Sequence, residues 1–143
     1  MNTRLEAATR VLLLTRPERR NKPLVEHLSG LGVVFSFTSE CSEAEKILAM
    51  KPSDGWVVLT DARLPDGTWR DILNYVTQAH IRAEIVVRAD KYDKELWLEA
   101  STLGIFDLLA PPYTQERTRR VIEAAAASCD KYPYSMDAEL PGS

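Results

Sequence analysis

Short apolar runs alternate along the chain with longer segments in which apolar residues recur at helical spacing. Five of the runs have the length and the Val, Ile and Leu content of buried strands: residues 11–14, 33–37, 56–60, 84–87 and 105–109. The segments that follow them, such as PLVEHLSGLG and TWRDILNYVTQA, have the period of amphipathic helices. Strands that alternate with helices form parallel sheets covered on both faces. We therefore predict a three-layer, doubly wound α/β domain on a five-stranded parallel sheet.

Local signals mark the ends of several predicted elements. Ser42 is followed three residues later by Glu45, which is the spacing of a capping box, so we expect a helix to begin near Ser42. Gly104 follows the fourth helical segment, and a glycine in this place is typical of a helix C-terminus. The Pro-Asp-Gly segment at 65–67 predicts a turn between the third strand and the third helix.

The length of the chain fits one domain. It has 143 residues, of which 45% are hydrophobic, and domains commonly hold roughly 100–150 residues. We predict an N-terminal extension at 1–9, a single domain at 10–128 and a flexible tail at 129–143. The tail is predicted because the segment after Asp130 loses its periodicity and contains Pro and Gly.

Composition and the lack of long apolar segments argue against several classes of function. The net charge of −3, from 18 basic and 21 acidic residues, gives no field that would recruit nucleic acid or an anionic membrane. No apolar run approaches the ~20 residues that span a bilayer, and the N-terminus lacks the apolar segment of a secretion signal. Cys41 and Cys129 match neither a redox pair nor a zinc spacing, so we expect reduced thiols in a cytoplasmic protein.

Candidate chemistry lies just after the strands, because the crevice of an open parallel sheet forms at their carboxyl ends. Thr15 and Arg16 follow the first strand, Asp61 ends the third, and Arg88 follows the fourth. The fifth strand is followed by Pro111 and Pro112. We expect these side chains to meet at one edge of the sheet.

The stretch VVLTDARLPDG, residues 57–67, resembles the phosphoacceptor strand and loop of the receiver domains of two-component response regulators (CheY-like). GIFDLLAPPY, residues 104–113, resembles the fifth strand of that family and its proline turn, and the likeness extends over 10–127. The resemblance implies a flavodoxin-like fold with receiver topology and places Asp61 at the phosphoacceptor position. It also implies a cis peptide bond between Pro111 and Pro112.

The family's other functional positions are replaced. Members hold Mg²⁺ with an acidic pair after the first strand, but the corresponding residues are Thr15 and Arg16. The family's Thr or Ser after the fourth strand is Arg88, its Lys after the fifth is Pro111, and its aromatic position three residues earlier is Leu108. We expect Arg16 and Arg88 to form a salt bridge with Asp61 and to occupy the volume that a divalent cation would use. No metal and no other cofactor is expected.

These departures predict a stand-alone, degenerate receiver, or pseudo-receiver, that is not an enzyme. It would act in signal transduction through protein–protein contacts, without the Mg²⁺-dependent phosphorylation cycle. One alternative is a phosphate-accepting receiver in which Asp61 binds the phosphoryl group, Mg²⁺ assists and Arg88 replaces the missing Lys. An alternative of another class is a small flavodoxin-like protein that binds a nucleotide or cofactor.

The expected partner is a kinase-like or output protein, with no direct contact to nucleic acid or membrane. A homodimer through the last two helices and the fifth strand is a further possibility that the resemblance implies. The two helices carry opposite charges that could fix the register of such a dimer: Asp93, Glu95 and Glu99 on one, and Arg117, Arg119 and Arg120 on the other.

Overall fold

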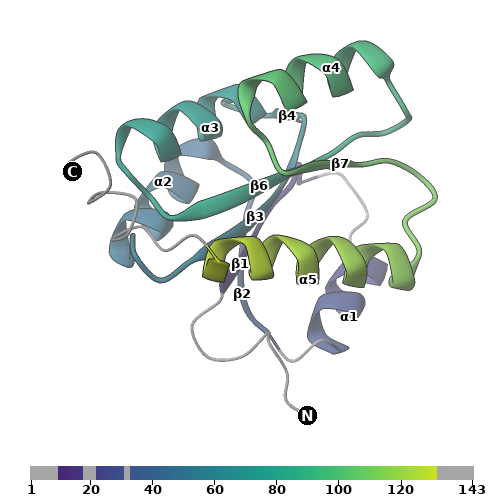
Figure 1. Ribbon diagram of the computed structural model, residues 1–143, viewed down its shortest axis with the longest axis horizontal. Helices are drawn as coiled ribbons and strands as arrows, with labels where there is room; N and C mark the ends of the chain where they lie inside the picture. The colour runs from purple at the N-terminus through teal and green to yellow at the C-terminus, as the bar shows by residue number, and fades with distance from the viewer. Residues whose placement is uncertain (1–9, 18–21, 31–32, 132–143) are drawn as a thin grey trace.

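Five parallel strands form the central sheet of the computed structural model, which describes residues 10–17, 22–30 and 33–131 (Figure 1). Their order across the sheet is β2-β1-β3-β6-β7. The strands are β1 (Arg10–Leu14), β2 (Val34–Thr38), β3 (Trp56–Asp61), β6 (Ala83–Arg88) and β7 (Asp107–Leu109). This arrangement confirms the predicted flavodoxin-like α/β fold.

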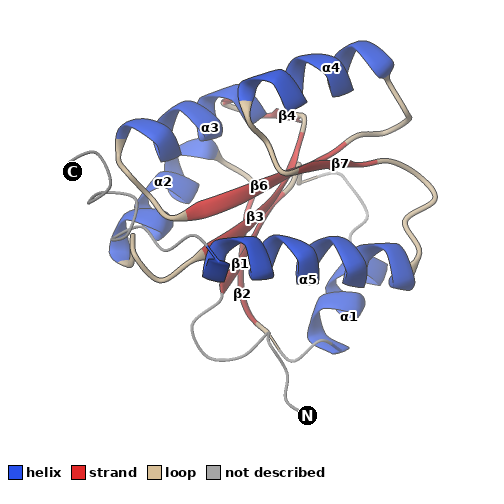
Figure 2. Cartoon of the chain, in the orientation of Figure 1, coloured by secondary structure: helices blue, strands red, loops and turns tan. Residues whose placement is uncertain are grey.

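Helices cover both faces of the sheet (Figure 2). They are α1 (Lys22–Gly30), α2 (Cys41–Met50), α3 (Trp69–Gln78), α4 (Lys94–Leu103) and α5 (Gln115–Lys131). One apolar cluster packs between the sheet and helices α2, α3 and α4, and a second packs between the sheet and helices α1 and α5. Alternate residues of β1 serve the two clusters, because successive side chains of a strand point to opposite faces. Leu12 packs in the cluster under α2, α3 and α4, whereas Leu13 packs in the cluster under α1 and α5.

A two-stranded hairpin lies between β3 and α3, where the sequence predicted only a turn. Its strands are β4 (Arg63–Leu64) and β5 (Gly67–Thr68), which pair antiparallel. Thr68 then begins α3 with a capping box, in which the Asp71 side chain accepts a hydrogen bond from the Thr68 backbone N–H at 2.9 Å. The hairpin therefore leads directly from the end of β3 into a firmly capped helix.

α2 begins near Ser42, as predicted, but the predicted capping box with Ser42 as the N-cap was wrong. The helix begins at Cys41, and Glu40 at its N-cap position makes no side-chain capping bond. Asp66 supplies the cap from the hairpin: its carboxylate accepts from the backbone N–H of Cys41 at 2.7 Å and of Ser42 at 3.1 Å. The local pattern failed because the carboxylate that satisfies these N–H groups comes from 25 residues further along the chain.

This contact changes the protonation of both partners. The hydrogen bond from the Cys41 backbone N–H is the main cause that lowers the pKa of Asp66. Burial, followed by the negative charge of Asp66, raises the pKa of the Cys41 thiol to about 12. Cys41 is therefore a protonated thiol across the physiological range.

Smaller expectations concern the ends of the last two helices and the turn between them. The peptide bond between Pro111 and Pro112 is cis, as the resemblance implied. Gly104 ends α4 with a left-handed backbone, φ 107°, which a glycine adopts without steric strain.

α5 continues past the predicted domain boundary at residue 128 to Lys131. The rest of the predicted tail and the predicted extension at 1–9 lie outside the described residues. Within the described part, no helix is long and apolar enough to cross a bilayer.

Candidate functional site

The carboxyl ends of β1, β3 and β6 bring four of the predicted site residues together. In the register of the sheet, Asp61 at the end of β3 lies opposite Arg88 at the end of β6. Leu14 lies opposite Thr60 on the other side of β3, so the chain leaves β1 through Thr15 and Arg16 beside Asp61. The alignment follows from parallel pairing, which places the ends of neighbouring strands at one edge.

The carboxylate of Asp61 is buried, with 1% of the residue exposed, and both of its oxygens are occupied. Oδ1 accepts from Arg88 Nε at 3.2 Å and lies 3.2 Å from Arg88 Nη2. Oδ2 accepts from the Thr15 hydroxyl at 2.9 Å and from the Arg16 backbone N–H at 2.8 Å. The predicted salt bridge is therefore present, and the backbone and hydroxyl donors add to it.

Two further contacts close this cluster. Arg88 Nη2 donates to the Thr15 hydroxyl oxygen at 2.8 Å, which makes a ring of contacts through Thr15, Asp61 and Arg88. Arg16 Nε lies 3.5 Å from Asp61 Oδ2, and the Arg16 side chain is 29% exposed. We call Thr15, Arg16, Asp61 and Arg88 the ionic lock. Buried charges require such complete pairing, because an unpaired one is strongly destabilising.

The other two predicted site residues take no direct part in the lock. Pro111 and Pro112 lie exposed in the turn between β7 and α5. A proline has no N–H and no side-chain donor, so neither residue replaces the missing Lys of the family.

Tyr113 contacts the lock, and Arg117 holds the turn that carries Tyr113. No motif or spacing in the sequence selects either residue. The Arg88 guanidinium carbon lies 5.7 Å from the centre of the Tyr113 ring, and the Tyr113 hydroxyl donates to the Ala89 carbonyl. Arg117 Nη1 donates to the carbonyls of Ala110 at 2.6 Å and Pro112 at 2.9 Å. Tyr113 lies in the turn between β7 and α5, so only the fold brings its ring to Arg88.

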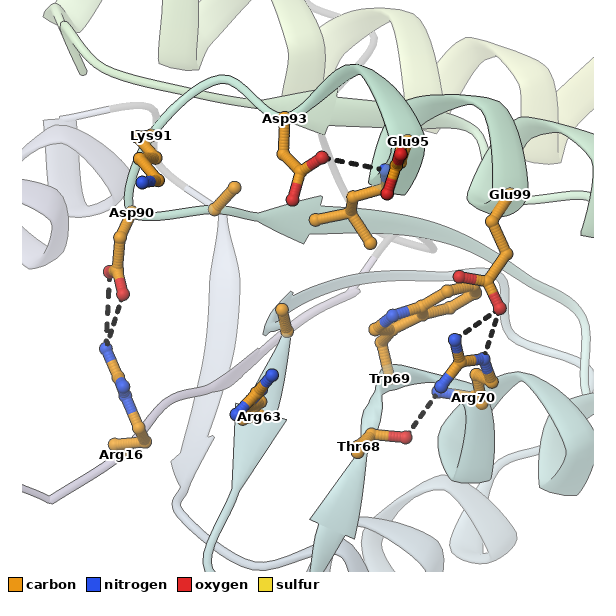
Figure 3. A pocket seen from close by; sticks show the side chains of 13 residues that line it. Arg16, Arg63, Thr68, Trp69, Arg70, Asp90, Lys91, Asp93, Glu95 and Glu99 are labelled. Atoms are coloured by element: carbon orange, nitrogen blue, oxygen red, sulfur yellow. Dashed lines mark hydrogen bonds and ion pairs between the residues drawn. The ribbon is translucent and has the colours of Figure 1, made fainter.

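A groove of about 520 Å³ runs from the mouth of the lock between α3 and α4 (Figure 3). Arg16 Nη2 and Asp90 Oδ1, 3.3 Å apart, form an ion pair at one end, and Arg70 pairs with Glu99 at the other. Its lining is largely charged, including Arg63, which Figure 3 shows on the hairpin side. Cofactor pockets are predominantly apolar, whereas this groove is largely charged. The lining therefore favours a hydrated surface for protein contact over a cofactor site.

The described residues contain no group of three or more His, Cys, Asp or Glu side chains that could hold a metal ion. At the lock itself, Asp61 is joined by two guanidiniums and a hydroxyl. Mg²⁺ prefers several oxygen ligands, with carboxylates to offset its charge. The residues around Asp61 therefore do not fit that ion.

The charges that were expected to fix the register of a dimer are mostly used within the chain. Asp93 caps α4 by accepting from the Leu96 backbone N–H at 3.1 Å, and Glu99 pairs with Arg70. On α5, Glu116 pairs with both Arg119 and Arg120, and the Arg119 hydrogen bond is the main cause that lowers the pKa of Glu116. Charge complementarity is thus a weaker argument for a dimer than the sequence indicated.

Exposed apolar side chains lie on α4 and in the loop before it, as they also do on β2 and α2. Leu98 and Leu103 on α4 are 53% and 50% exposed, and Tyr92 in the loop before it is 63% exposed. Exposed apolar side chains that form a contiguous patch often mark a surface for protein contacts.

No family model matches the chain, but curated proteins and solved structures do. It is 32% identical to the response regulator protein PilR of Pseudomonas aeruginosa over 83 residues, which are 58% of this chain and 18% of PilR. It is 29% identical to the transcriptional regulatory protein DpiA of Escherichia coli over 93 residues, 65% of this chain and 40% of DpiA. The chain therefore spans less than half the length of these relatives.

The similar solved structures are receiver domains. The signal receiver domain of an HD domain-containing protein from Pseudomonas fluorescens superposes with a TM-score of 0.74 at 21% identity, covering 87% of this chain and 98% of that one. FixJ-N gives a TM-score of 0.73 at 20% identity, with 83% and 94% covered. The chemotaxis protein CheY4 of Vibrio cholerae gives 0.71 at 16% identity, with 83% and 99% covered. These likenesses show the fold.

Proposed function

We infer that this chain, a receiver domain related to those of response regulators, signals through protein–protein contacts and without Mg²⁺-dependent phosphorylation of Asp61. The observation that carries this proposal is the complete occupation of the Asp61 carboxylate by Arg88, Thr15 and Arg16. The lock then holds the domain in one conformation, and the domain acts as a binding module with no enzymatic activity.

Asp61 is poorly placed to act as a nucleophile. An attacking oxygen needs an available lone pair and a path to the phosphoryl group, but each oxygen of Asp61 accepts from at least one buried or backbone donor. A hydrogen bond to a charged group contributes roughly 1.5–3 kcal/mol, so freeing one oxygen requires breaking more than one such contact.

The charge around Asp61 also opposes the metal. A phosphoryl group carries negative charge, and Mg²⁺ normally offsets its repulsion by the attacking carboxylate. Here Arg16 and Arg88 already neutralise Asp61, and each guanidinium would repel an approaching dication. The ion would have to displace both arginines before it could bind.

We propose a kinase-like or output protein in the cytoplasm as the partner, in keeping with signalling by receiver domains. The face made by α4, β7 and α5 is our candidate for that contact, and also for a homodimer. Its support is the exposure of Leu98 and Leu103, since the nearby charges are largely engaged within the chain.

One observation favours the phosphate-accepting alternative. Arg88 Nε and Nη2 lie 3.2 Å from Asp61 Oδ1, so a cation already stands where it could neutralise a phosphoryl group on that oxygen. This alternative differs from our proposal in predicting a covalent adduct at Asp61.

Intact-mass analysis after incubation with acetyl phosphate and Mg²⁺ distinguishes the two. We expect no phosphoryl adduct on the native chain. A receiver domain with a complete acidic pair, treated in the same way as a positive control, should be modified. An adduct on the native chain that disappears in Asp61→Asn would overturn the proposal and support Arg88 as the neutralising group.

Asp54→Asn is the matched control. Asp54 lies just before β3, at the other end of the strand that carries Asp61, and its side chain is 39% exposed. An adduct lost only in Asp54→Asn would mark a reaction at the surface and would leave the proposal standing.

A further inference from the structure

Tyr113 contacts two consecutive residues at the end of β6. Its ring lies against the Arg88 guanidinium, with 5.7 Å between the guanidinium carbon and the ring centre. Its hydroxyl donates to the carbonyl of Ala89. The two parts of this side chain therefore have different partners. The ring contacts Arg88 of the ionic lock, and the hydroxyl binds the backbone carbonyl of the next residue.

The ring restricts where Arg88 can point. The nitrogens of this guanidinium are directed at Asp61 and Thr15, and the aromatic face lies against it as a cation–π contact. Arg88 is 3% exposed, so water does not replace either set of contacts. If Arg88 leaves Asp61, its guanidinium must also leave the Tyr113 ring or carry the ring with it.

The hydroxyl restricts the loop between β6 and α4. Ala89 makes the last backbone bond to β7, from its N–H to the Leu109 carbonyl at 2.9 Å, and Tyr113 takes its carbonyl. The next residue is Asp90, which forms the ion pair with Arg16 at the mouth of the lock. The orientation of the Ala89 peptide therefore bears on both the loop and the Arg16–Asp90 pair.

The turn that carries Tyr113 is held by the start of α5. Arg117, in the first turn of that helix, donates to the carbonyls of Ala110 and Pro112 on either side of the turn. The turn that carries Tyr113 is thereby tied to α5, which belongs to the proposed partner face.

We propose that Tyr113 is the positioning residue that couples the ionic lock to the β6–α4 loop and to the first turn of α5. Opening the lock would then move the loop and the helix that border the partner face. This inference rests on the proposed function only in taking the lock as the element that holds the domain in one conformation. The residue differs from the one that the family resemblance indicated, because that position is Leu108, which is buried in the cluster on the opposite side of the sheet from α5.

The ring and the hydroxyl can be tested separately by NMR, using the Arg88 Nε–H signal and the exchange of backbone amides. Tyr113→Leu removes both contacts, and we expect the Arg88 Nε–H to exchange with water faster by about twofold to thirtyfold, the range of one cation–π contact. Tyr113→Phe keeps the ring, so we expect the Arg88 signal to remain while the amides of 89–92 exchange several-fold faster.

Tyr75→Phe is the matched control, because Tyr75 also donates its hydroxyl to a backbone carbonyl, that of Glu45 at 3.3 Å, away from the lock. It should leave both readouts unchanged. The reciprocal change is Asp61→Asn, which should speed exchange of the amides of 113–118 as well as of Arg88, since coupling acts in both directions.

The proposal is overturned if Arg88 Nε–H exchange in Tyr113→Leu equals that of the native chain. It is equally overturned if Asp61→Asn changes signals of the lock and none in 113–118. Should Tyr113→Leu fail to fold, Tyr113→Phe and Asp61→Asn still decide the question. These readouts need no phosphorylation, so an adduct at Asp61 would contradict the proposed function without bearing on the coupling.

Discussion

Arg88 and Asp61 lie opposite each other in the β3–β6 register, and the guanidinium of one meets the carboxylate of the other at 3.2 Å in the interior of the protein. Both residues are at most 3% exposed. The stability of this pair therefore depends on its being complete, because either charge left alone would be buried without its partner.

Arg88→Met should destabilise the domain by about 3–5 kcal/mol, the usual result of breaking a buried ion pair from one side. Met fills part of the volume but leaves the Asp61 charge without its main partner. Urea denaturation at neutral pH measures the change in the free energy of unfolding.

The double variant Asp61→Leu with Arg88→Met provides the comparison. Removing both charges together should recover most of the loss, because apolar replacements of buried pairs are often neutral. If the double variant is less stable than Arg88→Met alone, the pair does not dominate the energetics of the site.

Asp90→Asn should change the free energy of unfolding by less than about 1 kcal/mol, because exposed ion pairs contribute little. The Asp90 side chain is 66% exposed and its partner Arg16 keeps its contact with Asp61. The small loss should shrink further in high salt, which screens exposed charges. A loss of stability as large as that of Arg88→Met would contradict this expectation and would show that the Arg16–Asp90 pair stabilises the buried part of the lock.

The sheet and the lock were predictable from the sequence for the same physical reason. Apolar periodicity is a local property, so it identified the five strands, and parallel strands end at one edge. The residues that directly follow those strands must therefore be neighbours, which was enough to predict that Thr15, Arg16, Asp61 and Arg88 meet.

Contacts between distant segments could not be predicted in this way. Asp66 and Tyr113 lie in turns and contact backbone groups that are 25 and 24 residues away in sequence, and neither stands at a spacing that marks its role. Ser42 had the correct local spacing for a cap, yet the N–H groups at the start of α2 are satisfied by Asp66 from the hairpin. Local propensity is a weak guide wherever a tertiary contact can serve the same backbone groups.

Asp66→Ala should therefore destabilise the domain by about 0.5–2 kcal/mol, the range of lost helix caps. Ser42→Ala should stay within about 0.5 kcal/mol, as at most surface positions. The two variants compare the cap in the structure with the cap that the sequence suggested. A larger loss in Ser42→Ala than in Asp66→Ala would contradict the structural assignment.

The Asp66 contribution should also depend on pH. The pKa of Asp66 is lowered in the folded state. Its stabilisation is therefore fully present above the pKa of the unfolded state, about 3.9, and is lost as the pH falls through the folded-state pKa. Stability curves of the native chain and Asp66→Ala, measured between neutral and strongly acidic pH, should therefore converge at the acidic end. A constant difference across that range would show that the charge of Asp66 is not what stabilises α2.

Leu98→Glu tests the proposed partner face. If copies of the chain associate through α4, β7 and α5, the native protein should show a mass that rises with concentration in light scattering, and Leu98→Glu should remain a monomer. The reason is that a carboxylate placed in an apolar contact must be buried without a partner. Met50→Glu is the matched control, since Met50 on α2 is 76% exposed and lies outside this face. Equal effects of the two variants would place the association elsewhere, and a native monomer at every concentration would leave this face to a different protein.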